Sequence, residues 1–263
     1  MQVMGKKGIM RDKTLGALEH IQLAHDQGCE NKTYEPWTKK NIFEKRRRDW
    51  ILRCLYRALP QSGGVVVDLG CGYGYMTKQL VSSARVYGLD LKEGPLRDAL
   101  QQGVQPIVCN LANEIPLKSD TVDAVVAGEI IEHIMEPEVF LAQVLRILKP
   151  GGKLILTTPN LKALISLVYM ILRDRPSPQV FQPFHVRFFT FTSLAKLLRE
   201  AGFRVLSRRT NEVLPSSVVR YLPVIGKPLC FLFDFSNILL NILFRGLGTQ
   251  IMVMAEKARK ENR

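Results

Sequence analysis

The sequence contains few cysteines, and none of them belongs to a C-x-x-C pair. Its five cysteines are scattered over 263 residues, and their odd number and spacing argue against a disulfide framework and against a zinc knuckle. The N-terminal residues lack an apolar stretch long enough for a secretory signal peptide. Internal repeats and low-complexity tracts are also missing. These absences predict a protein of a reducing compartment, and we expect it to be cytoplasmic.

Long hydrophobic runs are missing as well. The longest one, residues 229–244, is broken by Asp234, Asn237 and Asn241, and a membrane-spanning helix needs roughly 18–20 apolar residues. A second apolar block, residues 161–172, ends in basic residues. We expect both blocks to lie in the interface of an anionic membrane as amphipathic or re-entrant segments. A lid over an apolar substrate pocket and a dimer interface are the alternatives.

Positive charge is concentrated in the flanks of the chain. The net charge is +13, to which residues 1–60 contribute +6, residues 61–158 contribute −3 and residues 159–263 contribute +10. Basic flanks are typical of contact with nucleic acid or with an anionic membrane, and also of a plain solvated face. The basic charge therefore belongs to the two flanks and not to the middle of the chain.

A dinucleotide-binding G-x-G-x-x-G fingerprint is absent, although a glycine-rich turn is present. Residues 65–75 read VVVDLGCGYGY, with glycines at 70, 72 and 74. Neither Gly70 nor Gly72 begins a match to the fingerprint, which argues against NAD or FAD. The β-branched run predicts a buried parallel strand, and the glycines predict a tight turn that lets a ligand approach the backbone.

Strands and helices alternate along the rest of the sequence. Further strands are predicted at residues 85–91, 106–110, 121–127, 154–158, 203–209 and 248–255, and helices at 41–59, 78–83, 139–148 and 192–202. This alternation predicts an α/β fold with a doubly wound, Rossmann-like, mostly parallel sheet of seven strands, whose site lies at the carboxyl ends of the strands.

We expect two parts in the chain. Residues 1–60 are predicted to form an N-terminal helical cap, and residues 61–263 the main domain, with apolar insertions at about 160–190 and 213–246. In the helix at 41–59 the run Lys45–Arg48 is expected on a basic face opposite an apolar stripe. That pattern favours a helix packed on the sheet edge over a nucleic-acid reader.

Residues 68–74 match the D/E-x-G-x-G-x-G motif, and the chain resembles class I S-adenosylmethionine-dependent methyltransferases over roughly residues 65–257. Within that superfamily it is most similar to the ubiquinone-biosynthesis O-methyltransferases. The resemblance implies S-adenosylmethionine (SAM) as methyl donor. It also implies a last strand that runs antiparallel between the fifth and sixth, so that residues 213–246 enlarge the connection before it.

The resemblance implies a donor site built from seven residues. Those expected to position the methionine part are Asp68, Gly70, Gly72 and Gly74. Asp90 ends the second strand, 20 residues after Gly70, where an acid can accept hydrogen bonds from both ribose hydroxyls. Asn110 and Leu111 are expected to border the adenine. Asn110 stands where the family usually has an acid, and its amide can both donate and accept.

Residues 128–133, GEIIEH, are similar to the E-x-x-E-H segment of the ubiquinone-type enzymes. Methyl transfer requires alignment of the acceptor and removal of its proton. His133 is the candidate base, because imidazole has a reference pKa close to neutral. The further catalytic candidates are Glu129, Glu132 and His185. An alternative is that all four side chains bind Mg²⁺, Mn²⁺ or Zn²⁺, as related metal-dependent O-methyltransferases do.

These features predict methylation, at an oxygen, of an apolar, quinone-like or lipid-linked small molecule at a membrane surface. Two alternatives remain. The isoelectric point of 9.7 suggests an RNA methyltransferase, but the N/D-P-P-Y/F segment of base methyltransferases is absent after the fourth strand. The other is a catalytically silent cofactor-binding subunit that anchors a partner enzyme at a membrane.

Overall fold

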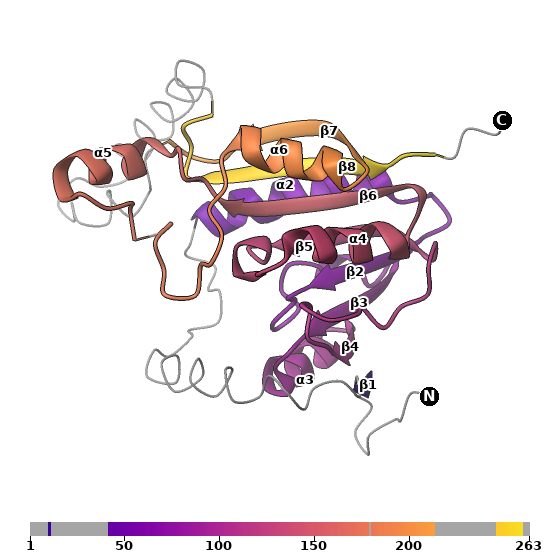
Figure 1. Ribbon diagram of the computed structural model, residues 1–263. Helices are drawn as coiled ribbons and strands as arrows, with labels where there is room; N and C mark the ends of the chain where they lie inside the picture. The colour runs from indigo at the N-terminus through magenta and orange to yellow at the C-terminus, as the bar shows by residue number, and fades with distance from the viewer. Residues whose placement is uncertain (1–9, 12–41, 179, 214–245, 260–263) are drawn as a thin grey trace, which may run out of the picture.

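The structure is a computed structural model that describes residues 10–11, 42–178, 180–213 and 246–259 (Figure 1). Its strands are β1 (Met10–Arg11), β2 (Val65–Leu69), β3 (Arg85–Asp90), β4 (Gln105–Val108), β5 (Val122–Gly128), β6 (Leu148–Pro159), β7 (Phe203–Thr210) and β8 (Gln250–Lys257). Its α-helices are α2 (Ile42–Ala58), α3 (Glu93–Gln101), α4 (Pro137–Ile147), α5 (Leu164–Arg173) and α6 (Phe191–Glu200). Two short 3₁₀ turns are η2 (Lys78–Leu80) and η3 (Ile131–His133).

The described strands form one sheet in the order β1-β4-β3-β2-β5-β6-β8-β7. β8 runs antiparallel to β6 and β7, and every other pair in the sheet is parallel. The predicted doubly wound sheet is thus confirmed, including the antiparallel last strand between the fifth and sixth. The two-residue β1, which pairs with β4, is an addition that the sequence did not predict.

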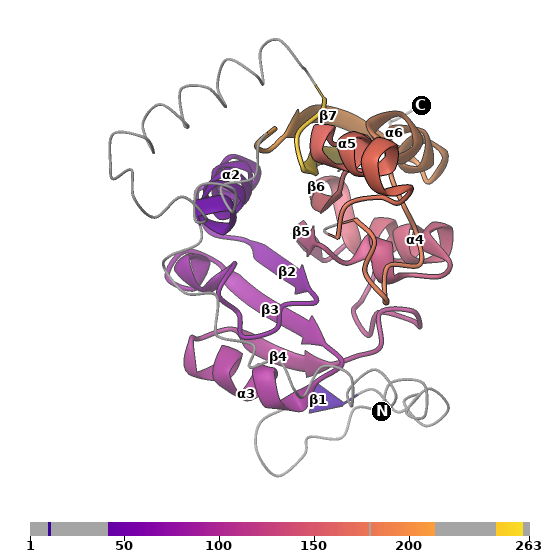
Figure 2. The ribbon, with the colours of Figure 1, turned by 90° about the vertical axis from the view of Figure 1, so that its left-hand side faces the viewer.

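Helices cover both faces of the sheet, α2 on one and α4 with α6 on the other (Figure 2). Successive residues of β2 point to opposite faces. Val66 belongs to the core cluster that contains Leu55 of α2, and Val67 to the cluster that contains Leu141 of α4. A strand buried on both sides is apolar throughout, which explains the uninterrupted valines at its start.

The helix predicted at residues 78–83 is wrong in type. Only the three residues of η2 are helical there, as a 3₁₀ turn. The hydroxyl of Thr77 donates to the Asp68 carboxylate at 2.8 Å, and the Ser83 hydroxyl donates to the Leu80 carbonyl at 3.2 Å. The Ser83 bond is local and competes with helical hydrogen bonding, whereas the Thr77 bond ties the start of the segment to β2. The chain therefore reaches β3 without completing an α-helix, and the helix α3 that follows was not predicted.

Helix α6 begins at Phe191, and its N-cap is Thr190. The prediction placed the start and the cap at Thr192. The Thr190 hydroxyl accepts from the Ser193 amide at 3.2 Å, and the Ser193 hydroxyl accepts from the Thr190 amide at 2.9 Å. This reciprocal capping box satisfies two amides that would otherwise lack partners.

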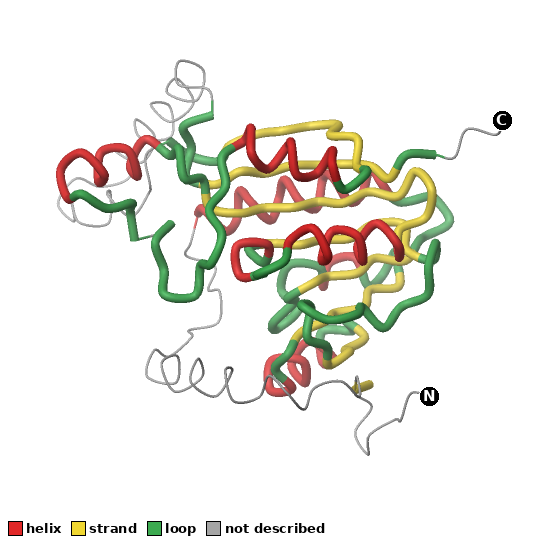
Figure 3. The backbone as a smooth tube through the Cα atoms, in the orientation of Figure 1, coloured by secondary structure: helices red, strands yellow, loops and turns green. Residues whose placement is uncertain are grey.

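The first predicted insertion contains α5, which projects past the carboxyl edge of the sheet (Figure 1). Its apolar side chains Val168, Ile171 and Leu172 are 40, 82 and 73 % exposed. The chain then continues as a loop to α6 (Figure 3). None of the described helices is both long and apolar enough to cross a bilayer. Of the second insertion and the N-terminal cap, residues 214–245 and most of 1–41 lie outside the described residues.

Candidate active site

Three glycines turn the chain sharply where β2 ends. Gly70, Gly72 and Gly74 have φ angles of 69°, 51° and 73°, a region that glycine enters without a steric penalty. The amides of Gly70 and Cys71 both donate to the Leu89 carbonyl, at 2.7 and 3.2 Å. The turn is therefore fixed to the end of β3, as the sequence analysis expects of a ligand-binding turn at the carboxyl edge.

The three glycines meet different surroundings. A Cβ on Gly70 would collide with the Ile130 side chain, and one on Gly74 would lie 3.1 Å from the Ala99 Cβ. A Cβ on Gly72 would have no atom within 4 Å. Packing thus leaves little room for a side chain at Gly70 and Gly74, whereas Gly72 presents bare backbone to open space.

Asp90 lies at the end of β3 and connects it to the turn. One carboxylate oxygen accepts from the Gly72 amide at 2.9 Å, and the other accepts from the Lys92 amide at 3.0 Å. A carboxylate oxygen has more than one acceptor site, so both remain able to accept from ribose hydroxyls. This placement is compatible with the predicted ribose role.

Asp68 is only 3 % exposed, so it lies beneath the turn. Its carboxylate accepts from the Thr77 hydroxyl. Burial raises the pKa of Asp68 from the ordinary 3.8 to about 7; the Asp90 charge adds to this, while the Thr77 hydrogen bond and Arg47 oppose it. Asp68 thus stabilises the turn through its hydrogen bond with Thr77. Its predicted contact with the methionine part of the donor stays a prediction.

The two candidates for the adenine follow β4. The Asn110 side-chain oxygen accepts from the Ala112 amide at 3.0 Å, which stabilises its own turn. The side-chain amide of Asn110 is therefore the group that can still donate to a base. Leu111 is 9 % exposed and belongs to the core cluster under α4, so only a small part of its side chain could contact adenine.

Glu129, the first residue after β5, has a φ of 58°, which is uncommon for a residue with a side chain. Its carboxylate accepts from the Thr157 hydroxyl at 2.8 Å and from the Gln250 amide at 3.0 Å. An Arg47 nitrogen lies 3.3 Å away. These partners, from α2, β6 and β8, hold the strained residue in place.

Arg47 is a site residue that the sequence analysis missed. It was expected on the basic face of its helix, yet it is 2 % exposed and pairs with Glu129. A signal was present, because Arg47 precedes the buried Trp50 and Ile51 by three and four positions and so shares their side of the helix. Its charge opposes the raised pKa values of Asp68 and Glu132.

Glu132 is 1 % exposed and lies in η3. One carboxylate oxygen accepts from the Thr158 hydroxyl at 2.9 Å, and the other has no hydrogen-bond partner among the described residues. Burial, and next the charge of Glu129, raise the pKa of Glu132. Its backbone carbonyl accepts from the amides of Val186 and Arg187, which brings the loop carrying His185 to the site.

His133 and His185 lie edge to face, with ring centroids 4.9 Å apart. Nδ1 of His133 is 2.9 Å from the Phe184 carbonyl, and Nδ1 of His185 is 2.8 Å from the Val180 carbonyl. Because a carbonyl can only accept, both Nδ1 atoms donate, and Nε2 carries the lone pair in each neutral ring. The geometry prepares each imidazole to accept a proton or to bind a cation.

Three of the four side chains in the alternative metal site lie close together. Ligand atoms of Glu132, His133 and His185 lie within 4.8 Å of one another. Glu129 is not part of this group, because its carboxylate is engaged with Thr157 and Gln250. One carboxylate and two imidazoles suit a transition metal such as Zn²⁺, so the remaining trio fits a divalent ion.

The chain is similar in sequence to known methyltransferases. A family model described as a methyltransferase domain matches residues 67–156. Residues 67–156 thus carry the sequence of a methyltransferase domain. A probable SAM-dependent methyltransferase from Mycolicibacterium smegmatis is 35 % identical over 177 residues, covering 66 % of this chain and 64 % of that protein. Human mitochondrial ubiquinone biosynthesis O-methyltransferase is 28 % identical over 201 residues, covering 70 % and 54 %.

Solved structures give the same fold. A SAM-dependent methyltransferase from Thermotoga maritima superposes with a TM-score of 0.55 at 20 % identity, over 91 % of this chain and 97 % of that one. The chain spans less than two thirds of the length of the two curated relatives above. The matched part of the chain is a methyltransferase domain, and the name of the mycobacterial relative points to SAM as the cofactor. The bare backbone at Gly72 and the two acceptor oxygens of Asp90 fit that cofactor.

Replacing Gly72 with alanine is expected to weaken SAM binding about tenfold or more. The added methyl group would enter the space that the cofactor needs, and overpacking costs about 1–3 kcal/mol. The fold should survive, because no atom lies within 4 Å of the new Cβ, although alanine at a positive φ costs roughly 1–2 kcal/mol. Isothermal titration with SAM measures the affinity.

Gly94 provides the matched control for this substitution. It lies in α3, and a Cβ there also has no atom within 4 Å. Gly94→Ala should bind SAM as the unmodified protein does. Equal affinity of the Gly72→Ala protein would show that the cofactor does not pass over this glycine.

Proposed function

We propose that the protein transfers a methyl group from SAM to an oxygen of an apolar, quinone-like or lipid-linked small molecule, as a cytoplasmic enzyme bound peripherally to a membrane. The observation that carries this proposal is the pair of imidazoles beside the buried Glu132. Their ligand atoms and that carboxylate share one small volume. A proton acceptor there suits the methylation of a hydroxyl group.

Apolar side chains near the two histidines in the sequence favour an apolar acceptor. Met135, Phe181, Val186 and Phe188 are 63, 58, 43 and 41 % exposed. The rings of Phe181 and Phe188 stack with centroids 6.3 Å apart. An exposed apolar cluster beside polar groups is typical of a binding surface. The similarity to a protein named for ubiquinone biosynthesis supports oxygen as the acceptor atom.

Each part of the site has a task in this proposal. When bound, SAM supplies an electrophilic methyl group. The glycine turn and Asp90 would hold it, and Nε2 of His133 would take the proton of the acceptor hydroxyl. The Phe184 carbonyl orients that imidazole through Nδ1, and Arg47 holds Glu129. Positioning and proton removal are the two contributions that such a displacement needs from a protein.

Helix α5 supports the membrane part of the proposal. Its exposed residues Val168, Ile171 and Leu172 are followed by Arg173 and Arg175. Apolar side chains can enter the interface while arginines meet lipid phosphates. Co-sedimentation with anionic vesicles should weaken in an Ile171→Asp protein but not in a Val139→Asp protein, whose changed residue is exposed on α4. A protein that ignores anionic vesicles would refute membrane contact.

Methyl-donor turnover against a lipid extract tests the activity. The expected result is a lipid-phase product heavier by one methylene unit in mass spectrometry, formed from SAM labelled in its methyl group. Label in RNA alone would instead identify an RNA methyltransferase. Tight SAM binding with no methylation of lipids or quinone precursors would identify a silent cofactor-binding subunit.

A further inference from the structure

A cavity lies away from the glycine turn, between α2 and the paired strands β7 and β8. It has a volume of about 460 Å³, and Figure 2 shows α2 on this side of the sheet. Helix α2 contributes Trp50 and Arg53 to its wall, β7 contributes Arg209 and Thr210, and β8 contributes Met252. None of these five residues belongs to the site described above.

Positive charge in this cavity exceeds negative charge. The carboxylate of Glu212 is paired with Arg46 at 2.9 Å. Asp49, the other acid of the wall, lies 3.9 Å from Arg48. Arg53 and Arg209 are exposed, and among the described residues neither has a recorded ion pair. Two guanidinium groups are therefore available to an anion.

Arg53 and Arg209 line the same cavity although they are far apart in the sequence. The thiol of Cys54 is buried next to the cavity, and burial raises its pKa. The charges of Arg57, Arg209 and Arg53 oppose that shift. The cavity is thus lined by one guanidinium group from a helix and one from a strand, an arrangement suited to holding an anionic group from two sides.

We propose that this cavity binds the phosphate group of an anionic ligand between Arg53 and Arg209. Guanidinium groups bind phosphate through paired N–H donors. Trp50 and Met252, each 6 % exposed, form apolar wall that an adjoining hydrocarbon part can contact. A phospholipid headgroup and a soluble phosphate ester share this chemistry.

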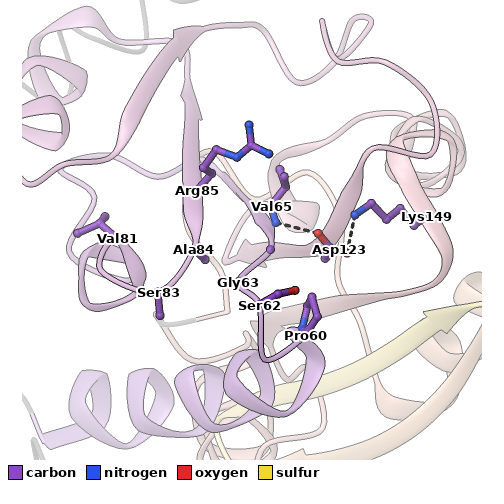
Figure 4. A pocket seen from close by; sticks show the side chains of 11 residues that line it. Pro60, Ser62, Gly63, Val65, Val81, Ser83, Ala84, Arg85, Asp123 and Lys149 are labelled. Atoms are coloured by element: carbon purple, nitrogen blue, oxygen red, sulfur yellow. Dashed lines mark hydrogen bonds and ion pairs between the residues drawn. The ribbon is translucent and has the colours of Figure 1, made fainter.

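Another cavity offers a control of similar size. It has a volume of about 520 Å³ and lies at the amino ends of β2 and β3 (Figure 4). Lys149 in its wall is neutralised by Asp123, at 2.7 Å. Arg85 is the one remaining cation among its lining residues. Because only one guanidinium is available there, we expect no phosphate binding.

Calorimetric titration tests the proposal with three probes: inorganic phosphate, dihexanoyl phosphatidic acid below its micelle concentration, and phosphatidic acid vesicles. Arg53→Gln and Arg209→Gln should each raise the dissociation constant about tenfold or more, the effect of losing hydrogen bonds to a charged group. Arg85→Gln should leave it unchanged. Arg209→Lys, which keeps the charge but loses the paired donors, should fall between.

The probes also separate the two sources. Binding of inorganic phosphate as tight as that of the lipid would assign the site to soluble phosphates, and binding of the lipid alone would assign it to a headgroup. Absence of binding, or an equal loss in the Arg85→Gln protein, would overturn the proposal. Unchanged thermal unfolding of each variant confirms folding. Because binding is measured without turnover, failure here would leave the proposed methyl transfer intact.

Discussion

Replacing His133 with alanine is expected to lower kcat by roughly 10²–10⁴-fold, the range that a positioned general base contributes. Its Nε2 carries the lone pair in the neutral ring, because Nδ1 donates to the Phe184 carbonyl. The KM for SAM should change little, because the glycine turn and Asp90 are formed by other elements. Steady-state kinetics with the identified acceptor measure both constants.

His185→Ala and Glu132→Gln distinguish proton transfer from metal binding. If His133 is the proton acceptor, His185→Ala should cost less than His133→Ala, and exhaustive chelation should leave the activity unchanged. If instead the trio holds an ion, all three substitutions should cause similar losses. Activity that disappears with a chelator and returns with Mn²⁺ or Zn²⁺ would then contradict the assignment of His133 as the base.

The sheet could be predicted from the sequence because its signals are local. Three valines before Asp68 predict a strand buried on both faces, and β2 is such a strand. The turn at residues 70–74 follows from glycines whose φ angles are positive. Asp90 ends its strand where the spacing places it. In each case the residue type and its neighbours are enough to decide the local structure.

The absence of an α-helix at residues 78–83 could not be predicted in this way. These residues have ordinary helical character, but the Thr77 hydroxyl bonds to Asp68, which is nine positions earlier. That contact exists only once β2 is in the sheet. Tertiary structure overrides local propensity here, as it commonly does.

The acidic residues of the site could be predicted from the sequence, but their hydrogen-bond partners could not. Glu129 and Glu132 follow β5 as expected, yet they bond to hydroxyls of adjacent residues on β6, Thr157 and Thr158. The positive φ of Glu129 turns its side chain to different neighbours from those of Glu132. Because this backbone angle is not readable from the sequence, the sequence alone could not narrow the alternative of a four-residue metal site to Glu132, His133 and His185.

The burial of Arg47 also depends on a residue that is distant in the sequence. A run of four basic residues on a helix is usually solvated, and a charge is buried only where it is paired. The partner Glu129 lies 82 positions further along the chain. The position of Arg47 on the side of Trp50 and Ile51 indicated burial, but only the fold shows which carboxylate compensates for it.

Replacing Asp68 with asparagine is expected to flatten the dependence of stability on pH. The pKa of Asp68 is about 7 in the folded protein and ordinarily 3.8. The folded state therefore retains a proton that the unfolded state loses. This contribution to stability is fully present below the ordinary pKa and is lost as the pH rises through about 7. The shift corresponds to on the order of 4 kcal/mol.

The neutral asparagine keeps an oxygen that can accept from Thr77, yet it never has to carry a buried charge. Urea unfolding measures the free energy of unfolding at pH 5 and at pH 8. Between these two pH values the unmodified protein should lose more stability than the Asp68→Asn protein, and the difference should be most of the ~4 kcal/mol. Asp98→Asn, which changes an exposed carboxylate on α3, should retain the slope of the unmodified protein. Parallel stability profiles for the Asp68→Asn and unmodified proteins would mean that Asp68 is already ionised in the folded state at pH 5, and that Thr77 and Arg47 outweigh its burial.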